Sequence, residues 1–326
     1  MPKSGTFAFS DPDDFRANLR EAGIELALTV SGDFKARLNH AELPHLRLLY
    51  VREERPRVAY VSLAPERIFV TFAARSCPPP LWGGVELRPG DVVLHSHGEQ
   101  MHQRTSGACH WASISQTAEH LAGCGKALTG QDLLPPPAGQ VLRLSPSAVA
   151  SLRQLHADAS RLVEKKPELI GHPEVARALE QAVIYALVTC LSIGAHCQNV
   201  APRRHRAEIM RQFEEALAAH PEHPPHLPEL CDAMRVPERT LRVCCAEFLG
   251  MSPIRYWRLR RLARVRAALR HADPATATVS DIARRHGFLQ LGRFAAQYRA
   301  AFWEVPSDTL QRVRRDTPDT TRAESA

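Results

Sequence analysis

Several patterns that mark common classes of protein are missing from this 326-residue sequence. Its eight cysteines form no C-x-x-C pair, which suggests reduced thiols, although a redox sensor at Cys77 or Cys109 stays open as an alternative. The amino terminus, MPKSGTFAFSDPDDF, lacks the apolar core of a signal peptide. The longest apolar run, 182–193, is too short to span a bilayer. We therefore expect a cytoplasmic protein with no membrane segment.

Motifs that support catalysis are also missing. The chain has no glycine-rich phosphate loop, no recognisable arrangement of a nucleophile with a base, and no complete metal motif. We therefore expect no enzymatic activity and no cofactor. The remaining composition, with 44% hydrophobic and 24% charged residues, is that of a globular protein long enough for two domains.

Lysine is absent from residues 203–315, yet this stretch is the most basic part of the chain. It holds 21 arginines against 12 acidic residues, a net charge of +9, whereas the whole chain carries +7. The rest of the chain is therefore slightly acidic. A concentration of positive charge in one region is what binding to nucleic-acid phosphates requires.

Residues 227–312 carry one apolar pattern twice, at a constant offset of 53 positions. The matched pairs are Leu241 and Phe294, Cys245 and Tyr298, Leu249 and Phe302, Gly250 and Trp303, and Pro253 and Pro306. Duplication of a small helical unit is the simplest account of this repeat.

Each copy of the repeat predicts a helix-turn-helix. Apolar residues at helical spacing occupy 227–234 and 241–248 in the first copy and 279–286 and 291–298 in the second. Between the copies, Ser252 and Pro253 begin a helix that extends to about His271. Its length of about 28 Å is close to the roughly 34 Å between successive major-groove faces of DNA.

The sequence of this region resembles that of a known family. LGMSPIRYWRLRRL, I-A-x-x-x-G-F and F-x-x-x-Y-R, spaced as they are here, resemble the DNA-binding domain of AraC-type transcriptional regulators. H-G-F-x-x-L-G-R-F-A-x-x-Y-R-x-x-F followed by P-S-x-T-L is similar to the subgroup that contains the ethanolamine-utilisation regulator. The resemblance implies double-stranded DNA as a partner, a homodimer, a small-molecule effector and contact with RNA polymerase.

The resemblance also implies which residues contact DNA. Family contact positions fall on Arg239, Arg242 and Val243 of the first recognition helix, while on the second only Arg293 and Gln297 face outward and can hydrogen-bond a base. The expected phosphate partners are Arg284, Arg285 and Arg299. We therefore expect the first unit to supply most of the sequence preference and the second mainly affinity.

The ends of the two recognition helices depart from the family pattern. Gly250 follows the first helix, as a left-handed cap prefers, but Trp303 follows the second, so that cap must differ or carry a conformational cost. Pro237 opens the first helix and cannot provide a side-chain cap.

Residues 25–115 are rich in short β-type segments separated by turn residues. The predicted strands are IELALTV, FKARLNHA, LRLLYV, RVAYVSL, RIFVTF, DVVLH and CHWASIS. Strands at this spacing suggest a barrel or jelly roll. The position agrees with the cupin-like effector-binding barrel that AraC-type regulators commonly carry before their DNA-binding domain.

A histidine cluster within this region is similar to the cupin metal motif, H-x-H before an acidic residue. Period-two spacing would place His95 and His97 on one strand face, where they could share a metal. The acidic ligand is missing, because Glu99 comes too early. We therefore expect no metal and assign the cluster to a polar loop or to an effector pocket. The candidate pocket residues are Arg75, Trp82, His95, His97, His102 and Trp111.

The predicted fold class is α+β: a cupin-like β-barrel, a helical connecting and dimerisation segment, and an all-α domain with two helix-turn-helix units. The expected limits are 1–145 for the sensor barrel, 146–222 for the helical segment, 223–315 for the DNA-binding domain and 316–326 for a disordered tail. The function expected is an effector-controlled transcriptional regulator. The alternatives are a metal-dependent cupin-type enzyme fused to a DNA anchor, and a constitutive DNA-binding protein whose barrel serves only for dimerisation.

Overall fold

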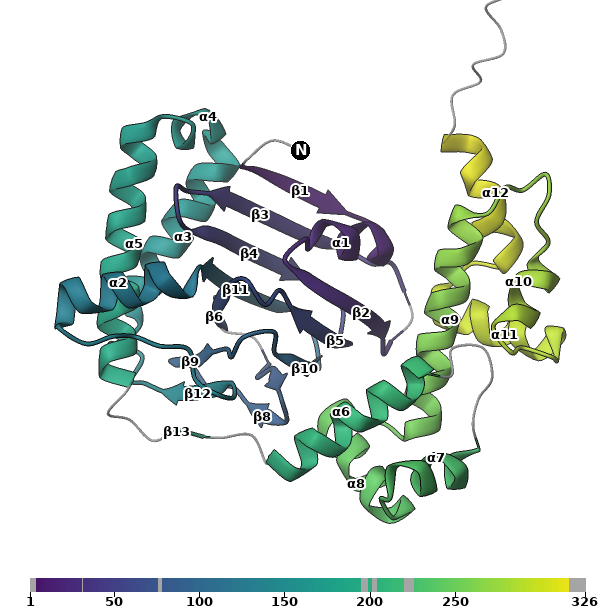
Figure 1. Cartoon of the computed structure of the whole chain (residues 1–326). Helices are drawn as coiled ribbons and strands as arrows, with labels where there is room; N and C mark the ends of the chain where they lie inside the picture. The colour runs from purple at the N-terminus through teal and green to yellow at the C-terminus, as the bar shows by residue number, and fades with distance from the viewer. Residues whose placement is uncertain are drawn as a thin grey trace, which may run out of the picture. The chain divides into compact units, whose positions relative to one another are not determined.

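The computed structural model describes residues 4–30, 32–75, 78–194, 199–200, 204–219 and 226–316 (Figure 1). The chain divides into two compact units, the first made mainly of residues up to 208 and the second mainly of residues from 209 onward. The predicted tail, apart from Asp316 at its start, and the candidate redox residue Cys77 lie outside the described residues. The other candidate, Cys109, is buried.

Two antiparallel sheets form the framework of the first unit. Their orders are β1-β3-β4-β11-β6-β9-β12-β13 and β2-β5-β10-β7-β8. The strands are β1 (Gly5–Phe9), β2 (Ala22–Leu28), β3 (Ala36–Glu42), β4 (Arg47–Glu53), β5 (Arg57–Leu63), β6 (Ile68–Ala73), β7 (Leu81–Trp82), β8 (Val85–Glu86), β9 (Asp91–Leu94), β10 (Gln100–Thr105), β11 (Cys109–Gln116), β12 (Gln140–Arg143) and β13 (Asn199–Val200).

All the predicted β segments form strands, and the α+β class is confirmed. They correspond to β2, β3, β4, β5, β6, β9 and β11. The sheets are open rather than joined into a closed barrel, because β1 and β13 end one sheet while β2 and β8 end the other. Three strands of four or more residues, β1, β10 and β12, were not predicted.

Alternating side chains of the larger sheet face helices on one side. The helices of this unit are α1 (Pro12–Asn18), α2 (Ala118–Thr129), α3 (Ala150–Lys165), α4 (Pro167–Ile170) and α5 (Pro173–Gly194). On β11, Ala112 and Ile114 join the core formed with α2, α3 and α5, whereas Trp111, Ser113 and Ser115 line a cavity on the other face. Period-two alternation therefore separates a helix-covered face from a cavity face.

The long helix α5 is apolar enough to meet a composition test for membrane crossing over Pro173–Ile193, but half of that window is buried inside the protein. Val183, Leu187 and Cys190 are fully buried in the core between the helices and the sheet. The buried apolar residues of α5 thus belong to the core of the first unit, where the helix lies beside α2 and α3 (Figure 1).

The second unit is helical. Its helices are α6 (Arg204–Ala219), which begins in the first unit, α7 (Leu227–Met234), α8 (Glu238–Leu249), α9 (Pro253–His271), α10 (Val279–Arg285), α11 (Leu291–Phe302) and α12 (Pro306–Asp316). The predicted pairs α7–α8 and α10–α11 and the connecting helix α9 are present at their predicted positions. Thr278 caps α10 by accepting the Asp281 N–H at 3.1 Å. The helix α12 was not predicted.

The two recognition helices end in the same backbone geometry despite different residues. Gly250 has φ of 68° and Trp303 has φ of 59°, both in the left-handed region. Each donates its N–H to the carbonyl four residues earlier, at 3.1 and 2.9 Å. The cap of the second helix therefore does not differ, and Trp303 carries the conformational cost of a left-handed residue with a Cβ atom.

Candidate nucleic-acid interface and effector cavity

The first recognition helix, α8, buries one face and exposes the other. Leu241, Cys244 and Cys245 are at most 1% exposed. The exposed side carries Arg239, Arg242, Val243 and Ala246, and together with Glu238 they line a shallow groove. The residues expected to contact bases thus share one accessible surface.

Glu238 holds the guanidinium of Arg242. The Arg242 Nε donates to Glu238 Oε1 at 2.7 Å, and Nη2 lies 2.5 Å from the same oxygen. Both side chains are more than 40% exposed, so this pair contributes little stability. Its effect is to hold a cation along the exposed face of the helix.

The second recognition helix, α11, exposes smaller residues than α8 does. Gly292, Arg293 and Ala296 are exposed and Gln297 is half-buried, while Phe294 and Tyr298 are buried. A Cβ atom on Gly292 would meet nothing within 4 Å, so the backbone there is accessible to a large partner. The expected phosphate partners Arg284, Arg285 and Arg299 are all exposed.

Not all arginines of the basic region are available to DNA. Arg260, Arg261 and Arg266 on α9 are 5–8% exposed. Arg261 donates to the carbonyl of His286 at 3.0 and 2.5 Å, and Arg266 donates to Glu304 at 2.9 Å. Arg261 and Arg266 thus join the connecting helix to the second helix-turn-helix and the turn that follows it.

The helix α6 packs on the first helix-turn-helix through buried residues. Met210 and Phe213 are at most 1% exposed. Glu214 accepts a hydrogen bond from Tyr256 Oη at 2.7 Å and forms an ion pair with Arg260. This helix is therefore attached to the second unit over its second half.

The first unit encloses a cavity of about 180 Å³ between its sheets. Its apolar wall contains the two tryptophans among the expected pocket residues, Trp82 and Trp111, whose ring centroids are 6.5 Å apart. Phe69 and Met101 continue this wall. A mainly apolar cavity with a few polar groups is the usual form of a small-molecule site.

One end of the cavity is polar, and its residues were not predicted. The Arg47 Nη1 lies 2.5 Å from Glu21 Oε1, and Ser115 Oγ donates to Glu21 Oε2 at 2.5 Å. His40 and Glu42 of β3 also line this end, on the face of the sheet opposite the helices. Burial lowers the pKa of His40 below its usual value, which favours the neutral imidazole.

The four remaining expected pocket residues are not among the cavity-lining residues. Arg75 and His97 are exposed, and His97 lies 3.1 Å from the carbonyl of Pro65 through its Nδ1. His95 is fully buried behind the wall, 2.8 Å from both Thr71 Oγ1 and Glu99 Oε2. His102 points to the opposite face of β10 from Met101, where burial lowers its pKa to about 3. The three histidines of the cluster do not converge on one point.

A buried ion pair supports Trp111 at the cavity wall. Glu53 and Arg57 have side chains 1% and 4% exposed and are joined by hydrogen bonds of 2.5 and 2.9 Å. Glu53 Oε1 also accepts the indole N–H of Trp111 at 2.7 Å. The position of this tryptophan therefore depends on a charge pair hidden from solvent.

Part of this chain is similar in sequence to known proteins. Residues 230–312 match the family described as "Helix-turn-helix domain". The chain is 30% identical over 148 residues to a probable thc operon regulatory protein of Rhodococcus erythropolis, covering 45% of each chain. It is 37% identical over 90 residues to a XylDLEGF operon transcriptional activator of Pseudomonas putida, covering 28% of each. The matches thus span less than half the length of these two relatives.

Solved structures of other proteins are also similar to part of this chain. A probable AraC family transcriptional regulator from Rhodopseudomonas palustris is 34% identical, covering 32% of this chain and 97% of that one, with a TM-score of 0.30. The AraC-like transcriptional activator CuxR is 14% identical, covering 80% and 94%, with a TM-score of 0.43. The closer resemblance to the ethanolamine-utilisation subgroup stays a prediction.

Proposed function

We propose that this chain, whose residues 230–312 form an AraC-type helix-turn-helix domain, is a transcriptional regulator that recognises a specific DNA sequence. The observation that carries the proposal is the pair of recognition helices with exposed side chains at positions expected to contact bases. They belong to one unit, joined by the 19-residue helix α9. Its length of about 28 Å suits helices that enter successive major grooves on one face of DNA.

The two helices have different tasks in this proposal. On α8, Arg239 and Arg242 recognise guanines, where one bidentate contact contributes roughly 1–3 kcal/mol of discrimination. On α11, small residues allow the backbone to approach phosphates, while Arg293 and Gln297 supply what base contact there is. Arg284, Arg285 and Arg299 add charge that does not depend on sequence.

Binding by full-length variants to selected DNA sites tests this division. Arg242→Ala relaxes the preference at one base pair, whereas Arg284→Ala weakens all sequences alike and lowers the magnitude of the salt slope by about one. Arg161→Ala, in a side chain 56% exposed on α3, is the matched control and changes neither property. Unchanged preference in Arg242→Ala beside a lost preference in Arg293→Ala would show that the roles of the helices are reversed.

We further propose that the cavity binds the effector. A mainly apolar cavity of roughly 150 Å³ holds one benzene-sized molecule, so we expect an effector near the size of one ring. Its polar group would face Arg47, Glu21 and His40. Screening compounds for a rise in the melting temperature of the full-length chain would find it, because a ligand of the folded state alone stabilises it. Trp111→Ala should abolish that rise, and a rise retained in this variant would place the effector elsewhere.

The remaining expectations complete the proposal. A homodimer is supported by large apolar side chains on the uncovered side of α5, where Val175, Tyr185 and Ile193 are 36–64% exposed. Such a regulator also requires RNA polymerase as a partner. Its location is then the cytoplasm. We propose no enzymatic activity, and no cofactor takes part in regulation by this route. Sedimentation of the full-length chain with and without Tyr185→Glu tests the dimer.

A further inference from the structure

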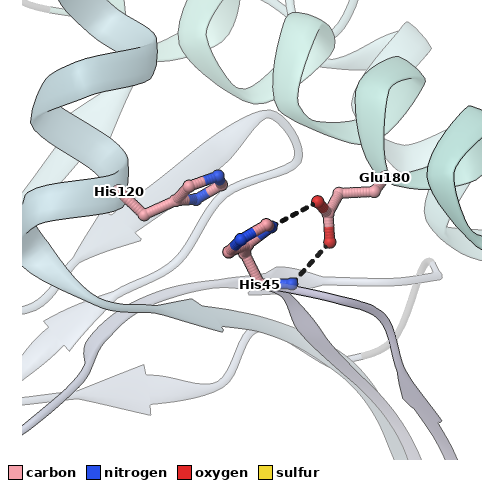
Figure 2. A group of neighbouring side chains, drawn as sticks. All are labelled: His45, His120 and Glu180. Carbon is pink, nitrogen blue, oxygen red and sulfur yellow. Dashed lines mark hydrogen bonds and ion pairs between the residues drawn. The ribbon is translucent and has the colours of Figure 1, made fainter.

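Three side chains from distant parts of the first unit meet beside the turn that joins β3 and β4, at one end of these strands (Figure 2). His45 lies in the turn between β3 and β4, His120 in the first turn of α2 and Glu180 in the middle of α5. Each offers one ligand atom, and these atoms lie within 4.8 Å of one another. None of the three takes part in the cavity or in the DNA-binding surface.

His120 is oriented as a metal-binding histidine would be. Its Nδ1 lies 2.7 Å from Gln116 Oε1, an amide oxygen that can only accept, so the ring proton is on Nδ1. The lone pair is then on Nε2, which lies 3.6 Å from Cys124 Sγ. A hydrogen bond from the second ring nitrogen to a neighbouring acceptor is the usual support of a ligating histidine.

Glu180 is held from behind by the backbone. Its Oε2 accepts the N–H groups of His45 and Leu46 at 2.7 and 3.3 Å, and Oε1 lies 2.9 Å from His45 Nδ1. The side chain is only 11% exposed. The carboxylate therefore has a fixed orientation, and its second oxygen faces the two imidazoles.

His45 can adjust to a bound ion. Its side chain is 60% exposed, and its ring stacks on that of His120 with centroids 4.6 Å apart. In a tetrahedral zinc site, ligand bonds of about 2.0–2.2 Å place neighbouring N and O atoms roughly 3.4 Å apart. Movements of about 1 Å, mainly in His45, would bring the three atoms to that spacing.

We propose that His45, His120 and Glu180 bind a zinc ion, with the thiolate of Cys124 as the fourth ligand. A set of imidazole, carboxylate and thiolate ligands favours zinc, whereas magnesium and calcium favour oxygen ligands alone. Binding releases the thiol proton of Cys124 to solvent, while each histidine binds as a neutral imidazole that keeps its proton on the ring nitrogen away from zinc. The ion would tie α2 and α5 to the turn between β3 and β4, and so stiffen the side of the unit formed by these helices.

Zinc binding to the full-length chain, first stripped of metal with a chelator, tests the proposal. The variants are His45→Gln, His120→Gln and Glu180→Gln, and His97→Gln is the control at an exposed histidine outside the group. Glu180→Gln keeps an oxygen that accepts the backbone N–H groups, so it removes the ligand charge with little change in structure. We expect one tight site in the unaltered chain, at least about tenfold weaker in each of the three variants and unchanged in the control.

Two further measurements separate this site from chance binding. Zinc should raise the melting temperature of the unaltered chain but not of His45→Gln, whose exposed position leaves folding intact. Cobalt in place of zinc should show a thiolate charge-transfer absorption that disappears in Cys124→Ser. Equal affinity in the unaltered chain and the three variants would overturn the site, and a missing thiolate absorption would overturn the role of Cys124.

Discussion

The buried pair between α6 and α9 offers a quantitative test of how the DNA-binding unit is built. Glu214 is 3% exposed, and it accepts a hydrogen bond from Tyr256 and pairs with Arg260, which is 5% exposed. Glu214→Gln keeps the shape but removes the negative charge that pairs with the Arg260 guanidinium. Removing one partner of a buried ion pair destabilises a protein by about 3–5 kcal/mol.

The neighbouring residue is a matched control. Glu215 pairs with Arg211 on the same helix, but its side chain is 57% exposed. An exposed pair contributes at most about 1 kcal/mol. Glu215→Gln therefore makes the same chemical change one position away, with an expected effect several times smaller.

Hydrogen exchange of the full-length chain, followed by mass spectrometry of peptides from α9, measures the free energy of unfolding of this unit. For Glu214→Gln we expect protection to fall by about 100-fold to 5,000-fold, the equivalent of 3–5 kcal/mol. For Glu215→Gln the fall should stay below about sixfold. Peptides from β11, in the first unit, provide the internal reference. Equal effects of the two substitutions would refute the view that α6 is part of the folded DNA-binding unit.

Three further predictions follow from particular contacts. Trp303→Gly should stabilise the second unit by about 1 kcal/mol, measured by thermal unfolding, because the residue is left-handed and 70% exposed. Burial lowers the pKa of His156 to about 4, so the first unit should lose stability as pH falls from about 6.5 to 4, and His156→Leu should flatten the dependence of the unfolding midpoint on pH. Glu53→Gln should destabilise the first unit by about 3–5 kcal/mol in urea unfolding and shift Trp111 fluorescence, since it removes the counter-charge of the buried Arg57, whose other hydrogen bond is to Gln103; an unchanged spectrum would contradict the proposed support of the indole.

Local spacing in the sequence was sufficient to place most helices and strands. The β6 segment, IFVTFA, is a short run of apolar and β-branched residues, and the α8 and α11 segments repeat apolar residues at helical intervals. These periods result from backbone geometry within a few residues, so they are visible without the fold. The strand β10, QMHQRT, was missed because its cavity-facing Gln103 is polar and its reverse-facing His102 is buried.

The roles of individual charged residues depended on tertiary packing. The arginines of residues 203–315 include exposed Arg242 and Arg284 and buried Arg260 and Arg266. Nothing in their spacing along the sequence distinguishes the exposed arginines from the buried ones. Position within α9 decides, since the buried arginines lie on the sides covered by α6 and by the second helix-turn-helix. Net charge could therefore predict a nucleic-acid partner but not which cations contact it.

Only the fold determines which side chains come together from distant parts of the sequence. His45, His120 and Glu180 come from a turn and two helices, and Glu21 meets Arg47 at the end of the cavity. The histidines that are adjacent in sequence, His95 and His97, separate instead, because β9 ends at Leu94 and the chain turns before His97. Sequence spacing fixes which side chains share a face only while one regular element continues. Beyond its end, strand order and helix packing determine which groups meet.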